Sequence, residues 1–134
     1  MHRDYELLIF DWDGTLSDSI GRIVDAMRQA AGLAGRPVRD DLAIKGIIGL
    51  GLPEAIRTLY PDITANDLID FRQHYADSYM AMDVEPSKLF DGVHESLEAF
   101  RAEGYRLAVA TGKARRGLDR VLKAHGWLDY FDAT

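Results

Sequence analysis

The sequence contains no cysteine in its 134 residues, which excludes disulfides, thiolate nucleophiles and thiolate metal ligands. Positive charge is also scarce, because 16 Lys and Arg stand against 22 Asp and Glu and leave a net charge of −6. This balance predicts no nucleic-acid partner and no anionic membrane partner. No apolar run approaches the roughly 20 residues that span a bilayer, and no signal peptide is visible. We therefore expect a cytoplasmic protein.

The most informative segment is the run DWDGTLSDS, residues 11–19, which follows directly on the apolar segment 7–10. Four consecutive apolar residues predict a strand that is buried on both faces. Asp11 and Asp13 lie two apart on an extended chain and therefore point to the same side, whereas Trp12 points elsewhere. Open α/β sheets bind their ligands at the carboxyl ends of strands, so these two carboxylates indicate a reaction centre.

The rest of the chain alternates between patterns typical of helices and of strands. The spacing of apolar residues predicts helices over 20–31, 38–48, 53–60, 64–82, 92–103 and 115–125. Strands are expected at 7–10 and 106–110, with the start of a third at 131–134. The apolar stripe of 64–82 is expected to pack, and not to bind a ligand, through its Tyr and Met residues: Leu68, Phe71, Tyr75, Tyr79 and Met82 form it. A helical insertion, 17–86, thus interrupts an α/β core made from 1–16 and 87–134.

A second motif, AVATGK at 108–113, also places a hydroxyl directly after a buried strand and before a helix. Amide groups at a helix start bind phosphate readily. The Thr111 hydroxyl and the Gly112 N–H are therefore candidate phosphate ligands. Lys113 and Arg115 could add positive charge to this site, or they could simply be solvated at the helix start.

These motifs resemble those of the haloacid dehalogenase-like (HAD) hydrolase superfamily, whose first signature is an apolar strand followed by D-x-D-G-T-L/V. The continuation Ser17-Asp18-Ser19 is similar to the branch with a helical cap, which includes phosphoglycolate phosphatases. The resemblance implies an α/β fold, with a Rossmann-like parallel sheet as its core and the insertion as an α-helical cap. Residues 48–53 resemble a substrate-selecting cap loop, although a plain glycine-rich loop accounts for them equally well.

The resemblance implies a Mg²⁺-dependent phosphomonoester hydrolase acting on a small phosphorylated metabolite. Asp11 would attack phosphorus and form an aspartyl-phosphate, while Asp13 would act as general acid and base. An acid at position 13 argues against a true dehalogenase.

The resemblance also implies which residues bind the metal ion and the phosphate. Mg²⁺ would bind the Asp11 side chain and the Asp13 backbone carbonyl. Phosphate contacts are expected from Trp12, Thr111, Gly112 and Lys113.

The family's third motif, a lysine, and its fourth, one or two acids, have no counterpart here. Asp40 and Asp41 do not substitute, because no apolar strand precedes them. Right-handed crossovers would place helices 92–103 and 115–125 on one sheet face and leave the other bare. We therefore expect a truncated core, or one that another chain completes, with weak or no activity and a bare sheet face available for self-association.

Two other functions remain open on the sequence alone. A phosphomutase would return the phosphoryl group to a sugar, and a noncatalytic binding module would keep the fold without the reaction. The four histidines show no metal-ligand spacing and are expected at the surface or in packing: His2, His74, His94 and His125.

Overall fold

The computed structural model describes residues 6–134, and His2 lies outside this range. The chain divides into two compact units. Unit 1 comprises the residues up to Asp18 together with Lys88–Thr134, and unit 2 is Ser19–Ser87. Ser17 and Asp18, which the sequence assigned to the insertion, belong to unit 1. The Asp18 N–H donates to the Lys88 carbonyl at 2.8 Å, and Ser17 forms an antiparallel bridge with Leu89.

Unit 1 is built on two parallel strands, β1 (Leu7–Phe10) and β2 (Arg106–Val109). Their register places Leu8 beside Leu107 and Phe10 beside Val109. A parallel bridge between Ala108 and Ala133 adds a third segment along the other edge of β2, where the sequence predicted the start of a third strand.

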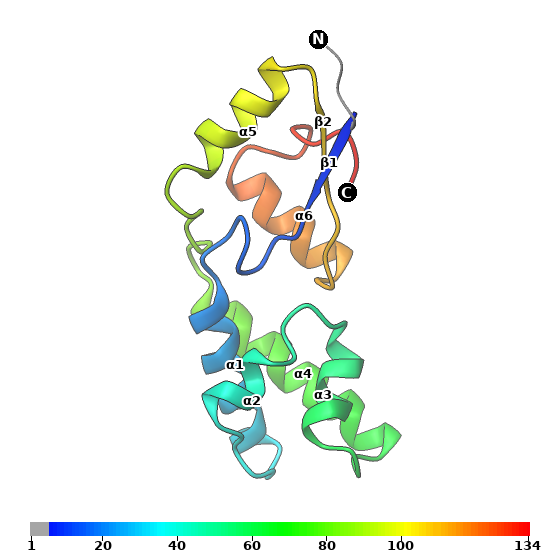
Figure 1. The fold of residues 1–134 in the computed structure, drawn as a ribbon. Helices are drawn as coiled ribbons and strands as arrows, with labels where there is room; N and C mark the ends of the chain where they lie inside the picture. Colours follow the sequence, from blue (N-terminus) through cyan, green and yellow to red (C-terminus); the bar gives the residue numbers. More distant parts are fainter. Residues whose placement is uncertain (1–5) are drawn as a thin grey trace. The chain divides into compact units, whose positions relative to one another are not determined.

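One face of this small sheet carries the core of unit 1. Helices α5 (Val93–Ala102) and α6 (Arg115–Ala124) both lie on that face (Figure 1). Successive right-handed crossovers in one direction produce this arrangement. Among the described residues, ten buried side chains form the core: Trp12, Leu16, Leu97, Leu107, Val109, Leu118, Val121, Leu122, Trp127 and Phe131.

The opposite face of β1 is exposed. Ile9 is 62% exposed and Leu7 is 41% exposed. The expectation that β1 is buried on both faces is therefore wrong for the described residues, because both helices of unit 1 pack on the same side. The expectation of a bare sheet face holds along β1, whereas Ala108 of β2, which pairs with Ile9, is only 5% exposed.

Substitutions on the two faces of this sheet should lower the free energy of unfolding by different amounts. Leu107→Ala removes a fully buried side chain and should lower the free energy of unfolding by about 2–5 kcal/mol. Ile9→Thr keeps a β-branched residue on the exposed face and should change it by about 0.5 kcal/mol or less. Urea unfolding of both variants measures the difference. Equal losses would show that the Ile9 face is covered in solution.

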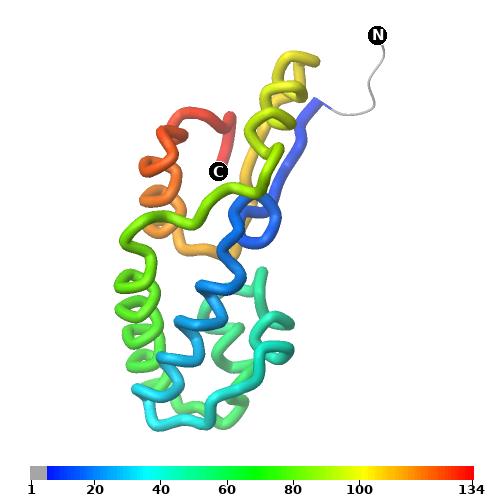
Figure 2. Tube along the Cα trace, turned by 90° about the vertical axis from the view of Figure 1, so that its left-hand side faces the viewer, coloured from blue at the N-terminus to red at the C-terminus, as the bar shows by residue number. Residues whose placement is uncertain are grey.

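Unit 2 is helical and contains α1 (Ile20–Leu33), α2 (Asp41–Lys45), α3 (Leu52–Leu59) and α4 (Ala65–Met82). Helices α1 and α4 run side by side (Figure 2). None of the helices described between residues 6 and 134 is both long and apolar enough to cross a membrane.

Local capping sets the helix boundaries in unit 2. The Thr64 hydroxyl accepts the Asp67 N–H at 3.2 Å, as the sequence predicted for the start of α4. Helix α2 is shorter than the expected 38–48, because the Asp40 carboxylate accepts the Ala43 N–H at 2.8 Å and starts the helix there. Ser19 is the N-cap residue of α1 but makes no side-chain capping bond.

The core of unit 2 confirms the packing role expected for the apolar stripe of α4. Leu68, Phe71 and Tyr79 are buried, and Tyr75 and Met82 pack against the buried clusters.

One buried acid was not anticipated from the sequence. Asp83, 2% exposed at the carboxyl end of α4, forms an ion pair with Arg22 of α1. The same guanidinium donates to the Glu85 carbonyl at 2.6 Å. This arginine therefore ties the start of α1 to the end of α4.

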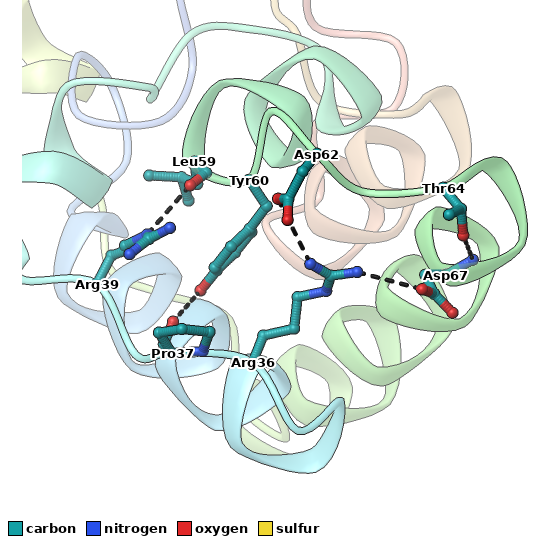
Figure 3. Close-up of polar contacts among 8 residues, drawn as sticks. All are labelled: Arg36, Pro37, Arg39, Leu59, Tyr60, Asp62, Thr64 and Asp67. Carbon is teal, nitrogen blue, oxygen red and sulfur yellow. Dashed lines mark hydrogen bonds and ion pairs between the residues drawn. The ribbon is translucent and has the colours of Figure 1, made fainter.

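Tyr60, which is 1% exposed, joins the segment after α1 to the end of α3 (Figure 3). Its hydroxyl donates to the Pro37 carbonyl at 2.6 Å. The Arg39 guanidinium lies 4.8 Å from the ring centroid, and its Nε donates to the Leu59 carbonyl at 3.1 Å. Arg36 continues the network by pairing with Asp67 at 3.2 Å and with Asp62 at 3.7 Å.

This contact gives a pH-dependent prediction. Burial raises the pKa of Tyr60 above its usual value of 10, against the opposing effect of Arg39 and Arg36. The unfolded chain therefore releases this proton first, so the free energy of unfolding should fall as the pH rises above 10.

Tyr60→Phe should cost about 1 kcal/mol at neutral pH, since it removes the hydrogen bond to Pro37. It should also reduce the alkaline loss of stability. Some loss will remain, because burial raises the pKa of Tyr130 as well. Urea unfolding as a function of pH measures both effects, and identical alkaline slopes for the two proteins would contradict the prediction.

Candidate active site

The loop after β1 is fixed by the side chain between the two candidate carboxylates. Trp12 is 1% exposed and packs edge-on against Trp127, with ring centroids 6.5 Å apart. Its carbonyl accepts the N–H groups of Leu16 and Ser17 at 3.0 Å. Gly14 adopts φ 78°, a left-handed conformation that favours glycine, and closes the turn. The indole therefore anchors a tight loop that carries an acid on either side of it.

The two carboxylates have different surroundings. Asp11 is exposed, and its Oδ1 accepts the Trp12 N–H at 2.7 Å. The side chain of Asp13 is only 13% exposed. The sequence predicted that Trp12 points away from Asp11 and Asp13, and in the structure its side chain lies in the core of unit 1. Any phosphate contact from Trp12 would therefore come from its backbone, whose N–H is bonded to Asp11.

The second loop lies beside the first, because β1 and β2 are parallel and in register. The Ala110 N–H donates to the Phe10 carbonyl at 2.9 Å, which continues the ladder to the point where both strands end. Thr111 is half-buried, and its Oγ1 accepts the Lys113 N–H at 3.1 Å. A hydroxyl that accepts a hydrogen bond can still donate its own proton to a ligand. Gly112 is exposed at this turn.

Lys113 joins the two loops. Its Nζ lies 3.7 Å from Oδ1 of Asp13, and both side chains are 13% exposed. The sequence left open whether Lys113 adds charge to the site or is solvated at the helix start. The structure places its side chain against Asp13, an acid of the first motif, instead of in solvent. Arg115 contacts Asp119 at 3.5 Å and donates to the Thr134 carbonyl at 2.6 Å.

The oxygen donors at the end of β1 suit a hard cation. Mg²⁺ is commonly bound by one or two carboxylates, with waters and substrate phosphate completing its octahedral shell. The exposed Asp11 carboxylate and the Asp13 backbone carbonyl fit such a partial set. Within residues 6–134, no group of three or more His, Asp or Glu side chains gathers as a metal site would require. The chain's described residues therefore fit Mg²⁺ only when substrate and water supply the remaining ligands.

Residues that the sequence excluded from the site have other partners. Asp40 caps α2, and Asp41 pairs with Arg28 at 2.9 Å in unit 2. His94 lies 3.6 Å from Glu98 and is largely exposed. The His125 ring packs 6.1 Å from Trp12, measured between ring centroids.

The sequence located both loops but missed the ion pair between them. A lysine two residues after the candidate phosphate-binding threonine was visible, and so was its positive charge. The distance from that lysine to Asp13 depends on strand register and on a side-chain path, neither of which a sequence pattern specifies.

Comparison with known proteins gives a family match over nearly the whole chain. Residues 8–134 match the family model described as haloacid dehalogenase-like hydrolase. A tyrosine-protein kinase, PtkA, from Mycobacterium tuberculosis is 35% identical over 128 residues, which is 95% of this chain and 43% of that protein. A phosphoglycolate phosphatase from Vibrio vulnificus is 33% identical over 136 residues, covering 96% of this chain and 60% of that protein.

A solved structure shows the same fold. A haloacid dehalogenase-like hydrolase from Bacteroides fragilis superposes with a TM-score of 0.84 at 30% identity, covering 97% of this chain and 62% of the other. The chain therefore spans about half of the length of these relatives, from 43% to 62%.

Proposed function

Because this chain belongs to the haloacid dehalogenase-like hydrolase family, we propose that it carries the phosphoryl-transfer residues of a small-molecule phosphomonoesterase. One observation supports this above all others. The parallel pairing of β1 with β2 brings Asp11 and Asp13 to the same end of the sheet as the loop 111–113. That is where open α/β sheets bind ligands.

In the proposed reaction an Asp11 carboxylate oxygen attacks phosphorus, and the bond between phosphorus and the alcohol oxygen breaks. Asp13 donates a proton to the departing alkoxide. Water then attacks the aspartyl-phosphate and loses a proton to Asp13, and the phosphorus–Asp11 bond breaks to release phosphate. The sum is ester plus water giving alcohol plus phosphate, so both side chains return to their starting states.

The remaining site residues would bind the phosphoryl oxygens. The Thr111 hydroxyl and the Gly112 N–H are proposed donors at the start of α6, and Lys113 supplies positive charge next to Asp13. This local charge matters because the net charge of −6 repels a phosphate dianion.

Mg²⁺ is the cofactor that this proposal includes. It would be held by the Asp11 side chain and the Asp13 backbone carbonyl, and it would neutralise charge between the carboxylates and the phosphoryl group. The partial oxygen donor set described above supports a divalent ion that also binds substrate oxygens.

The names of the relatives describe two outcomes of one chemistry. Phosphoglycolate phosphatase implies transfer of the phosphoryl group to water, and tyrosine-protein kinase implies transfer to a phenol. The identities of 33% and 35% do not separate them. We favour hydrolysis because Asp11 is exposed to water, whereas transfer to a phenol needs a second bound substrate. A phosphomutase and a noncatalytic module remain as the alternatives.

The test combines a covalent mimic with turnover. In the presence of Mg²⁺, beryllium fluoride should bind wild-type protein at Asp11 and give a ¹⁹F resonance that Asp11→Asn abolishes. The same variant should remove any hydrolysis of p-nitrophenyl phosphate or 2-phosphoglycolate. Its stability should change by about 0.5 kcal/mol or less, because Asp11 is exposed and an amide oxygen can still accept the Trp12 N–H.

Asp18→Asn is the matched control, since it makes the same change of charge at another exposed acid of this segment. It should leave the resonance and any turnover intact. Phosphotyrosine formation from ATP would favour the kinase reaction instead, and a phosphorylated sugar product would favour the mutase. Absence of both mimic binding and turnover would favour the noncatalytic module.

A further inference from the structure

The pair formed by Lys113 and Asp13 joins the two loops of the proposed active site. The ammonium nitrogen lies 3.7 Å from the Asp13 carboxylate, and each side chain is 13% exposed. Water screens such a pair less than it screens a pair on the open surface. Lys113 is therefore held by the carboxylate that the proposed reaction uses for proton transfer.

The path of the lysine side chain explains how one residue touches both loops. Its backbone N–H donates to the Thr111 hydroxyl at 3.1 Å, so the side chain starts at the proposed phosphate site. Its stem then passes over the first turn of α6 at Gly117. A Cβ atom on residue 117 would lie 3.5 Å from Lys113 Cγ and 3.6 Å from Cε. Alanine would fit there in ordinary contact, but a larger side chain would occupy the volume of the stem.

Two anions would therefore compete for one ammonium group when a phosphate ester enters. The Asp13 carboxylate holds Lys113 in the structure, and a phosphoryl group at Thr111 would lie beside the start of the same side chain. Hydrogen bonds between an ammonium and phosphate oxygens are short and strong, and a phosphate dianion carries more charge than one carboxylate.

We propose that Lys113 is exchanged between these anions: it pairs with Asp13 in the phosphate-free site and turns to the phosphoryl group when the ester binds. This proposal rests on the function proposed above. Lys113 is then a positioning residue for Asp13 as well as a phosphate contact.

The exchange predicts an unusual result for phosphate binding. Asp13→Asn should tighten the binding of inorganic phosphate, because the variant removes the competitor for Lys113. We expect a gain of about fivefold when Lys113 is present and about twofold or less in a Lys113→Met background, where only general repulsion is relieved. Lys113→Met alone should weaken phosphate binding about tenfold.

The measurement is a titration of the wild type, both single variants and the double variant with inorganic phosphate, followed by ³¹P NMR in buffer containing Mg²⁺. Thermal unfolding of each protein establishes that it is folded. Two controls repeat the charge changes elsewhere in unit 1. The first is Lys123→Met, because Lys123 is exposed on α6. The second is Asp119→Asn, which removes an acid that pairs with Arg115. Both controls should change phosphate affinity by less than about twofold.

The outcomes separate the exchange from the function on which it rests. A larger gain from Asp13→Asn with Lys113 than without it supports the exchange. Equal gains in both backgrounds, or a loss with Lys113 present, would overturn the exchange and leave the phosphate site standing. If the wild type binds no phosphate while remaining folded, the proposed function fails, and the exchange fails with it.

Discussion

The parallel pairing of β1 with β2 is the constraint on which the proposed site depends. It aligns Phe10 with Val109, so the two loops that carry polar groups leave the sheet at the same edge. Trp12 anchors the first loop in the core of unit 1, because its buried indole cannot move without disrupting that core. A hydrogen-bonded sheet edge and a buried anchor between two acids give short polar side chains a defined place to meet, as preorganised sites require.

Negative charge at this edge is partly offset within the chain. Two carboxylates on one loop repel each other and repel phosphate esters, and the net charge of −6 adds to that repulsion. Lys113 offsets part of it through its contact with Asp13. The lysine belongs to the loop proposed to bind phosphate, so in the proposed exchange the same cation serves the phosphate-free and the phosphate-bound site. Gly117 keeps its path open along α6.

Much of the fold and of the candidate site was predictable from the sequence, because the local patterns of apolar and capping residues were strong. The apolar segment before Asp11, the stripe of α4 and the Thr64 cap specified elements that the structure contains. Other features depended on partners distant in sequence. Ile9 is exposed because α5 and α6 share the other face, and Asp83 is buried because Arg22 reaches it from α1. The contact between Lys113 and Asp13 needed strand register and a side-chain path, which spacing alone does not specify. The expected roles of Asp11, Asp13 and Thr111 in catalysis remain predictions.

The most direct test of the convergence of these groups is a crystal structure of the protein with Mg²⁺ and vanadate, whose oxygens mimic a phosphoryl group in transfer. The account predicts vanadium bonded to an Asp11 carboxylate oxygen, with vanadate oxygens in hydrogen-bond contact with the Thr111 hydroxyl and the Lys113 ammonium. Vanadate bound away from the end of β1, or Asp11 and Thr111 directed toward separate surfaces, would contradict it.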